Sequence, residues 1–515
     1  MIPSVLAQHV RQGVEDFLRT TFPVSTPFFH GMVDRLFREE GEVFKGPYLS
    51  IQLPFRFGKA GHDFFPDVPL SFRPYLHQEK AFERLSCPNP KSTIIATGTG
   101  SGKTECFIYP ILDHCYRHHG EPGIKAILIY PMNALATDQA HRLARIIYNS
   151  PDLRTNVTAG LYIGQSEREP RMVMGPDSII TNKETMRLNP PDILLTNYKM
   201  LDYLLIRPKD YPLWKQNNSE TLQYLVVDEL HTFDGAQATD LACLIRRLKT
   251  RLKTPRDFLC CVGTSATLGS EKNPEALLQY VRVLFGEPFD DDAVITESQL
   301  TAGEFLEKSL ISRIDIISPE KTDQLDPEQY DGYQSYISSQ YELWFGETIS
   351  AKNFDKIQWR IDLGEKLIEH LFFQNLLKVL GGKVKNYNEI LNELEKVTPE
   401  FKRGSEKYQL GLINSILSLV SEARTKVSEG NNEVTAPFLN VRLHFWLREL
   451  RRMVGKVGRE PDLRFSDDLN ERQLKNHLPV VNCRECGSTG WAGIKRQNDT
   501  SVNPDLQSFY IGFFK

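Results

Sequence analysis

The residues best suited to chemistry form a glycine-rich segment, Ala96–Glu105 (ATGTGSGKTE), between an apolar run and a helical pattern. Its three glycines allow backbone N–H groups to close around phosphates, and the N-terminus of the following helix adds a favourable dipole. In such a loop, Lys103 reaches the β- and γ-phosphates and the hydroxyl group of Thr104 binds Mg²⁺. Thr97 replaces the first glycine of the GxxxxGK[ST] pattern, so a glycine-rich turn beside a chance Gly-Lys-Thr is the alternative. The strand–loop–helix context favours a nucleotide site.

A pair of acids follows another apolar run, in Tyr224–His231 (YLVVDELH). An acid at the carboxyl end of a strand, in the same sheet as a phosphate loop, is placed to hold the Mg²⁺ of a nucleotide. Asp228 fits this role, and Glu229 can orient and deprotonate the attacking water. Two solvated acids that open a helix are the alternative, because acids also suit a helix N-terminus. Together with Lys103, the pair predicts nucleotide hydrolysis.

Short apolar runs between residues 92 and 267 must position these groups. Runs of this length, separated by helical patterns, predict buried parallel strands in an α/β sheet. An open α/β sheet binds its ligand at the carboxyl ends of the strands. The runs are Ser92–Ala96, Lys125–Tyr130, Asp192–Thr196, Tyr224–Val227 and Phe258–Val262.

The organisation of the whole chain is less regular than this central part. Its 515 residues are enough for two to four domains. We expect an N-terminal extension at 1–75, a nucleotide-binding unit at 76–290, a helical accessory domain at 291–435 and a C-terminal segment at 436–515. The last segment is expected to contain an amphipathic basic helix, Val441–Met453, and a Cys-x-x-Cys pair.

The composition excludes several classes of protein. With 40% hydrophobic and 25% charged residues the chain is globular, and no apolar run approaches the ~20 residues that span a bilayer. We therefore expect a cytoplasmic protein without a membrane partner. The net charge of −4 means that any surface for nucleic acid must be local. The basic runs 246–253 and 442–452 are candidates, although a solvated helix face explains each equally well.

Further segments resemble the first RecA-like lobe of a superfamily 2 helicase of DExH type. The motif order is matched by His77-Gln78, Tyr130–Gln139 (motif Ia), Leu161–Gly164, Leu194–Tyr198 (motif Ic) and Gly263–Thr267 (motif III). Finer similarity is to large bacterial helicases with a DUF1998 region, which include YprA-like repair helicases and Druantia- and DISARM-type antiphage helicases. The segments that carry it are Phe44–Tyr48, Asp228–Leu248, Val441–Leu450 and Cys483–Gly487.

The resemblance implies an α/β fold with a RecA-like parallel sheet. The pattern of the rest of the chain predicts an N-terminal extension and a mainly helical C-terminal half. The resemblance also implies ATP and Mg²⁺ as cofactors and Lys103, Asp228 and Glu229 as catalytic residues, with Mg²⁺ held by Thr104 and Asp228. ATP would be held by Gln78, which reads adenine, and by Thr99, Gly100, Ser101, Gly102, Lys103, Thr104 and Asp228. His231, Ser265, Ala266 and Thr267 would couple hydrolysis to strand movement. Asn133, Gln139, Thr196 and Asn197 would touch a nucleic-acid backbone, with DNA favoured, although Thr196 and Asn197 could simply end a strand.

A motor of this type needs a second lobe, whose arginines stabilise the transition state. The nearest string to the expected arginine motif is Gly455–Arg459 (GKVGR), which we interpret as a basic loop. We therefore expect the second lobe in a missing C-terminal region or in a second polypeptide.

Cys483 and Cys486 form half of a zinc ribbon. A tetrahedral site needs four ligands, and His477, six residues before the first cysteine, is a weak third candidate. Two free thiols are favoured over Zn²⁺ in this incomplete site.

The sequence thus predicts an ATP-dependent DNA helicase or translocase, in antiphage defence or DNA repair, represented by its first lobe. The alternatives are a nucleotide-gated DNA- or protein-binding subunit with little ATP turnover, and a degenerate gene fragment.

Overall fold

The computed structural model of the 515-residue chain forms two compact units. It describes all residues except 39–42, 60–63, 69, 71, 99, 165–168, 267–273, 308, 430–431, 496–499 and 514–515. Thr99 and Thr267, two predicted site residues, therefore lie outside the described residues. The sheet unit comprises Phe55–Gln299 and Ser428–Asn432, and the second unit comprises Met1–Pro54, Leu300–Val427 and Glu433–Lys515. The sheet unit thus begins and ends outside the range 76–290 expected from the sequence.

Within the described residues, seven parallel strands form the sheet in the order β4-β5-β3-β6-β7-β2-β8. Their bounds are β2 (Thr93–Ala96), β3 (Ala126–Tyr130), β4 (Ala159–Tyr162), β5 (Ile193–Asn197), β6 (Tyr224–Val227), β7 (Cys260–Ser265) and β8 (Val294–Thr296). The predicted parallel sheet is confirmed. The apolar runs located five of its strands; β4 and β8 are additional.

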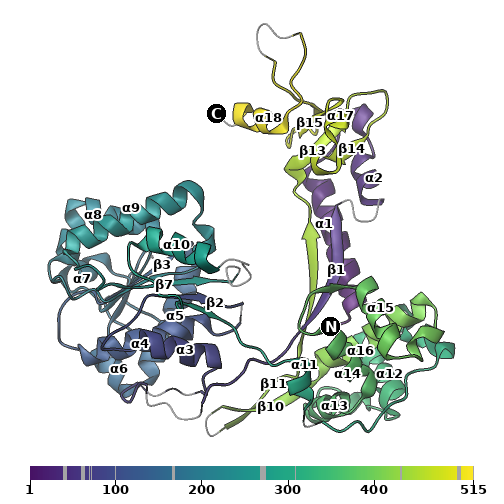
Figure 1. The fold of residues 1–515 in the computed structure, drawn as a ribbon, viewed down its shortest axis with the longest axis horizontal. Coiled ribbons are helices and arrows are strands. Elements are labelled where there is room, and N and C mark those ends of the chain that lie inside the picture. The colour runs from purple at the N-terminus through teal and green to yellow at the C-terminus, as the bar shows by residue number, and fades with distance from the viewer. Residues whose placement is uncertain are drawn as a thin grey trace. The chain divides into compact units, whose positions relative to one another are not determined.

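Helices cover both faces of the sheet (Figure 1). One layer contains α3 (Leu76–Leu85), α4 (Lys103–Arg117), α5 (Asn133–Asn149) and α6 (Pro151–Asn156); the other contains α8 (Tyr198–Ile206), α9 (Gly235–Leu252) and α10 (Pro274–Phe285). Because successive strand residues point to opposite faces, Leu128 packs under the first layer and Ile127 and Ile129 under the second. Burial on both faces, at about 1.5–3 kcal/mol for each such side chain, explains why the runs are continuously apolar.

The second unit has one large hydrophobic core, formed by residues 302–439 together with residues 49–53, and a smaller core around Leu18, Leu36 and Phe465. The helices are α1 (Pro3–Thr21), α2 (Met32–Arg38), α11 (Ala302–Leu306), α12 (Tyr333–Phe345), α13 (Gln358–Ile368), α14 (Leu371–Leu380), α15 (Tyr387–Val397), α16 (Glu406–Glu422), α17 (Glu471–Leu474) and α18 (Leu506–Phe513). The strands are β1 (Phe44–Gln52), β9 (Lys385–Asn386), β12 (Asn440–Leu447), β13 (Met453–Lys456), β14 (Leu463–Phe465), β15 (His477–Asn482) and β16 (Thr489–Trp491). β10 (Arg424–Glu429) and β11 (Asn432–Pro437) form a separate two-stranded sheet. None of the described helices is both long and apolar enough to cross a membrane.

The prediction of a basic helix at Val441–Met453 is wrong. This segment forms β12, which pairs antiparallel with β1, followed by a short 3-10 turn and β13. Val441 and Leu443 pack on the core of the unit, while Arg442 between them lies on the other face. The alternation therefore has the period of a strand, and its partner lies almost 400 residues earlier in the chain.

Candidate functional site

The phosphate loop joins β2 to α4 at the carboxyl edge of the sheet. Gly100 and Gly102 have φ angles of 81° and 77°, in the left-handed region that favours glycine. A Cβ atom on Gly102 would also lie 2.3 Å from Nε2 of Gln78. Glycine at position 102 is therefore required both by the backbone and by the close approach of Gln78. Lys103 and Thr104 follow directly as the first residues of α4.

Two side chains of α3 hold the backbone of this loop. Nε2 of His77 lies 2.8 Å from the carbonyl oxygen of Ser101, and because a carbonyl only accepts, this nitrogen carries the hydrogen. Burial lowers the pKa of His77, which keeps the ring neutral. Gln78 donates to the carbonyl oxygen of Gly102 at 3.2 Å and accepts from the N–H of Tyr75 at 2.9 Å. Gln78 thus supports the loop directly, whereas its reading of adenine stays a prediction.

Ser101 contributes to the loop from inside. Its hydroxyl group is buried and donates to the hydroxyl oxygen of Thr97 at 2.7 Å. The side chain therefore stabilises the loop from within.

The acidic pair lies at the carboxyl end of β6, beside this loop. Nζ of Lys103 is 3.4 Å from Oε1 of Glu229, and both side chains are largely buried. Burial raises the pKa of Asp228, while a hydrogen bond from Thr264 and the positive charge of Lys103 act in the opposite direction. The structure thus brings together the three predicted catalytic residues.

Glu229 has a left-handed backbone, with φ 49° and ψ 52°. This conformation is uncommon for a residue with a side chain and costs of order 1–3 kcal/mol. Such strain is concentrated at functional sites. The N–H of Glu229 donates to the hydroxyl oxygen of Thr264 at 3.2 Å, so the neighbouring strand supports the strained residue.

His231 lies between the acidic pair and the end of β7. Its Nδ1 atom is 3.3 Å from Oε2 of Glu229 and 3.3 Å from the hydroxyl oxygen of Ser265. Ala266 follows Ser265 and is exposed. A contact that spans β6 and β7 is suited to the predicted coupling role.

The predicted nucleic-acid residues fall into two groups. Asn197 donates to Oδ1 of Asn133 at 2.7 Å and caps α8 by accepting from Met200 N–H, so these two asparagines meet at the carboxyl edge. Gln139 lies two turns along α5, and its Oε1 atom has no hydrogen-bond partner among the described residues. Thr196, by contrast, is fully buried, and its hydroxyl group donates to a backbone carbonyl. The structure therefore does not bring Thr196 to the surface.

Two residues that sequence reasoning did not assign complete the site. Thr264 lies within motif III and contacts both Asp228 and Glu229. Glu297, after β8, accepts a hydrogen bond from the N–H of Gly98 in the phosphate loop at 2.7 Å. The motif could have suggested Thr264, whereas Glu297 carries no sequence signal because its contact spans 199 residues.

The cysteine pair belongs to the other unit. Cys483 and Cys486 are exposed free thiols. Cys486 lies 3.2 Å from the hydroxyl oxygen of Ser488, and this hydrogen bond lowers the pKa of Cys486. Nowhere in the described part of the chain do three or more His, Cys, Asp or Glu side chains gather as metal ligands. The residues present thus do not fit a complete Zn²⁺ site.

The C-terminal basic run is largely neutralised. Arg448 pairs with Asp468, Arg452 with Asp467 at 2.8 Å, and Arg451 with Glu449. These pairs favour a structural role for the run over a free phosphate-binding face.

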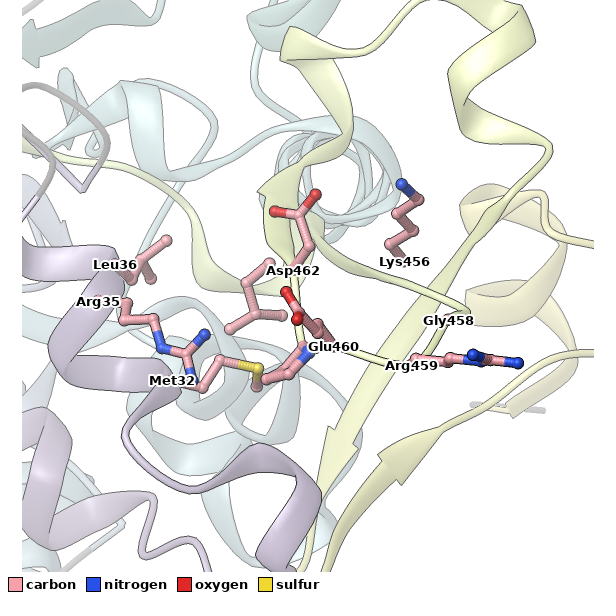
Figure 2. Close-up of a pocket in the computed structure, with 10 residues that line it drawn as sticks. Met32, Arg35, Leu36, Lys456, Gly458, Arg459, Glu460 and Asp462 are labelled. Carbon is pink, nitrogen blue, oxygen red and sulfur yellow. The ribbon is translucent and has the colours of Figure 1, made fainter.

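The loop after β13 borders a cavity of ≈540 Å³. Figure 2 shows Met32 and Arg35 of α2 on one side of it and Lys456 and Arg459 on the other. Glu460 also lines the cavity, so its mixed charge does not indicate an anion site.

Comparison with known proteins supports the resemblance of the sheet unit. Residues 75–276 match the model of the DEAD/DEAH box helicase family. The chain is 29% identical to the Druantia protein DruE of Escherichia coli over 308 residues, which cover 41% of this chain and 17% of the relative. It is 31% identical to a Methanocaldococcus jannaschii protein named as an ATP-dependent helicase over 263 residues, 48% of this chain and 34% of the relative. It is 28% identical to the ATP-dependent helicase YprA of Bacillus subtilis over 198 residues, 38% of this chain and 23% of the relative.

The matches thus span about a third or less of the length of these relatives. Among solved structures, the DUF1998 helicase MrfA matches with 24% identity and a TM-score of 0.33, over 49% of this chain and 34% of that one. Its complex with DNA matches with 17% identity and a TM-score of 0.37, over 78% and 64%. The predicted resemblance to superfamily 2 helicases, including YprA-like and Druantia-type proteins, is confirmed by the family model over residues 75–276 and by the curated relatives.

Proposed function

We propose that this chain, whose residues 75–276 belong to the DEAD/DEAH box helicase family, binds and hydrolyses ATP as the first lobe of a nucleic-acid motor. The observation that supports the proposal most directly is the meeting of Lys103 with Glu229, beside Asp228, at the carboxyl edge of one parallel sheet. A cation from the phosphate loop after β2 and two acids after β6, with β7 between these strands, are the groups that phosphoryl transfer requires.

Each residue has a role that follows from its place. Lys103 binds the β- and γ-phosphates, and Thr104 and Asp228 would hold Mg²⁺, which neutralises developing charge on the phosphates when bound. Glu229 orients the attacking water and accepts its proton. Its contact with Lys103, at 3.4 Å, holds the carboxylate beside the phosphate loop, where this step takes place.

The nucleic acid is proposed to be DNA, bound along the carboxyl edge beside Asn133 and Asn197. The pairing of these side chains, from α5 and α8, supports a surface that follows a phosphate backbone without reading sequence. Similarity to a Druantia protein and to YprA supports a role in antiphage defence or DNA repair. A second lobe, supplied by a longer polypeptide or a partner, would complete the motor.

ATP turnover by the chain, with and without single-stranded DNA or RNA, tests the proposal. Lys103→Ala should reduce turnover by about 10²–10³-fold, as expected when one transition-state contact is removed. Lys80→Ala is the matched control, because Lys80 is exposed on α3. Equal turnover of Lys103→Ala and Lys80→Ala would refute the site. Binding of ATP to the wild type without turnover would favour a nucleotide-gated binding subunit instead.

A further inference from the structure

Glu297 links the phosphate loop to the end of the sheet unit. It follows β8 directly and lies outside the segment that matches the helicase family. Its Oε2 atom accepts the N–H of Gly98 at 2.7 Å, and its Oε1 atom accepts from the side-chain amide of Gln299 at 2.9 Å. Both carboxylate oxygens are thus engaged, one with the loop and one with the chain that leaves the sheet.

Further hydrogen bonds of the sheet unit join the segment after Glu297 to the segment that begins at Phe55. The N–H of Arg56 donates to the carbonyl oxygen of Ser298 at 2.8 Å, and its guanidinium group donates to the carbonyl oxygen of Gln299 at 3.2 Å. The unit boundary falls next to both segments, at Pro54–Phe55 and at Gln299–Leu300. The carbonyl oxygen of Arg56 also accepts the N–H of Leu76, the first residue of α3. The segment around Arg56 is therefore hydrogen-bonded both to residues 298–299 and to α3, the helix whose His77 and Gln78 hold the phosphate loop.

We propose that Glu297 is a positioning residue that holds the nucleotide-free phosphate loop and reports nucleotide binding to residues 297–299. The inference rests on the proposed function, because it requires the loop to bind ATP. A carboxylate that accepts a backbone N–H makes a strong, charge-assisted hydrogen bond. The same negative charge repels a triphosphate that enters the loop. ATP therefore weakens the bond to Gly98 and releases the segment that carries Gln299.

A purely structural role for Glu297 gives different results. If Glu297 only closed the end of β8, removing its charge would leave nucleotide affinity unchanged. Glu297→Gln keeps the acceptor oxygen and removes the charge, whereas Glu297→Ala removes both. Asp291→Asn is the matched control, since Asp291 lies six residues earlier with a side chain that is 99% exposed.

Two measurements on the 515-residue chain test the proposal: the affinity for a fluorescent ATP analogue, and hydrogen exchange of residues 294–300 with and without it. Glu297→Gln should bind the analogue about fivefold more tightly than the wild type does, which is the size of one screened charge interaction. Glu297→Ala should bind the analogue more weakly than Glu297→Gln does. The analogue should accelerate exchange in the wild type and in Asp291→Asn, while Glu297→Ala should exchange rapidly in both conditions.

Equal affinities of the wild type and Glu297→Gln, with exchange that does not respond to the analogue, would overturn this inference and leave the proposed function intact. Absence of any binding by the wild type would instead overturn both.

Discussion

The hydroxyl group of Thr264, on β7, donates a hydrogen bond to the carboxylate of Asp228 at the end of β6. The same oxygen accepts the N–H of Glu229 at 3.2 Å. Thr264 is fully buried, so water cannot replace either bond. One side chain therefore fixes the proposed Mg²⁺ ligand and the proposed base relative to each other.

Thr264→Val should lower the turnover number for ATP by about 10–10²-fold and leave KM nearly unchanged. Valine fills the same volume but supplies no partner to Asp228 or Glu229, and an unmade hydrogen bond to a charged group costs about 1.5–3 kcal/mol. Steady-state kinetics would separate the two constants. Thr239→Val is the control, because Thr239 lies exposed on α9 and its hydroxyl group donates to the carbonyl oxygen of Gly235 in the same helix. A rise in KM alone would contradict a role in the chemical step.

Asp228→Asn should stabilise the nucleotide-free chain while it abolishes turnover. Burial raises the pKa of Asp228 in the folded state above the ordinary value of 3.8. At a pH between 3.8 and this raised pKa, the folded state therefore binds more protons than the unfolded state. The free energy of unfolding then falls as pH rises through this interval, and at neutral pH the ionised carboxylate opposes folding. Removing the charge should add about 0.5–2 kcal/mol, or about 2–4 °C in Tm per kcal/mol.

Thermal unfolding at several pH values, without Mg²⁺ or nucleotide, measures this effect. The gain in Tm of Asp228→Asn over the wild type should be full at pH 7 and should become smaller as the pH falls toward 4. Asp291→Asn, at an exposed position, should show no gain in Tm. A loss of Tm at neutral pH would mean that Asp228 contributes more through its bond to Thr264 than it costs through burial.

Gly102→Ala should abolish nucleotide binding, while Gly120→Ala should not. Both glycines have positive φ angles, 77° and 84°, so both variants bear a similar backbone strain of about 1–2 kcal/mol. Only at Gly102 would the new Cβ meet Gln78, whereas nothing lies within 4 Å at Gly120. Titration with an ATP analogue, together with Tm, separates the two effects. Equal binding by both variants would show that the approach of Gln78 is not needed.

Local patterns in the sequence predicted the parts of the site that lie within motifs. The apolar runs before Lys103 and Asp228 predicted strands that end at one edge, because a strand buried on both faces has a recognisable composition. Two features of the structure were not predicted from the sequence, because they depend on partners that are distant along the chain. Arg442 and its neighbours were interpreted as a helix, since pairing with β1 could not be seen locally. Glu297 had no motif, and only the parallel pairing of β8 with β2 places it beside the loop.

The contact of His231 with two elements predicts a selective loss of coupling. Nδ1 of His231 is 3.3 Å from both Glu229 and Ser265, so it links the hydrolytic acid to the end of β7 without touching Lys103 in the described contacts. His231→Ala should therefore leave basal ATP turnover within about threefold of the wild type, a loss of under 1 kcal/mol, and should remove its stimulation by single-stranded DNA. His119→Ala, at an exposed position two residues after the end of α4, should preserve both rates. Stimulation that survives in His231→Ala would mean that coupling runs through other residues, and loss of basal turnover would instead make His231 part of the hydrolytic machinery.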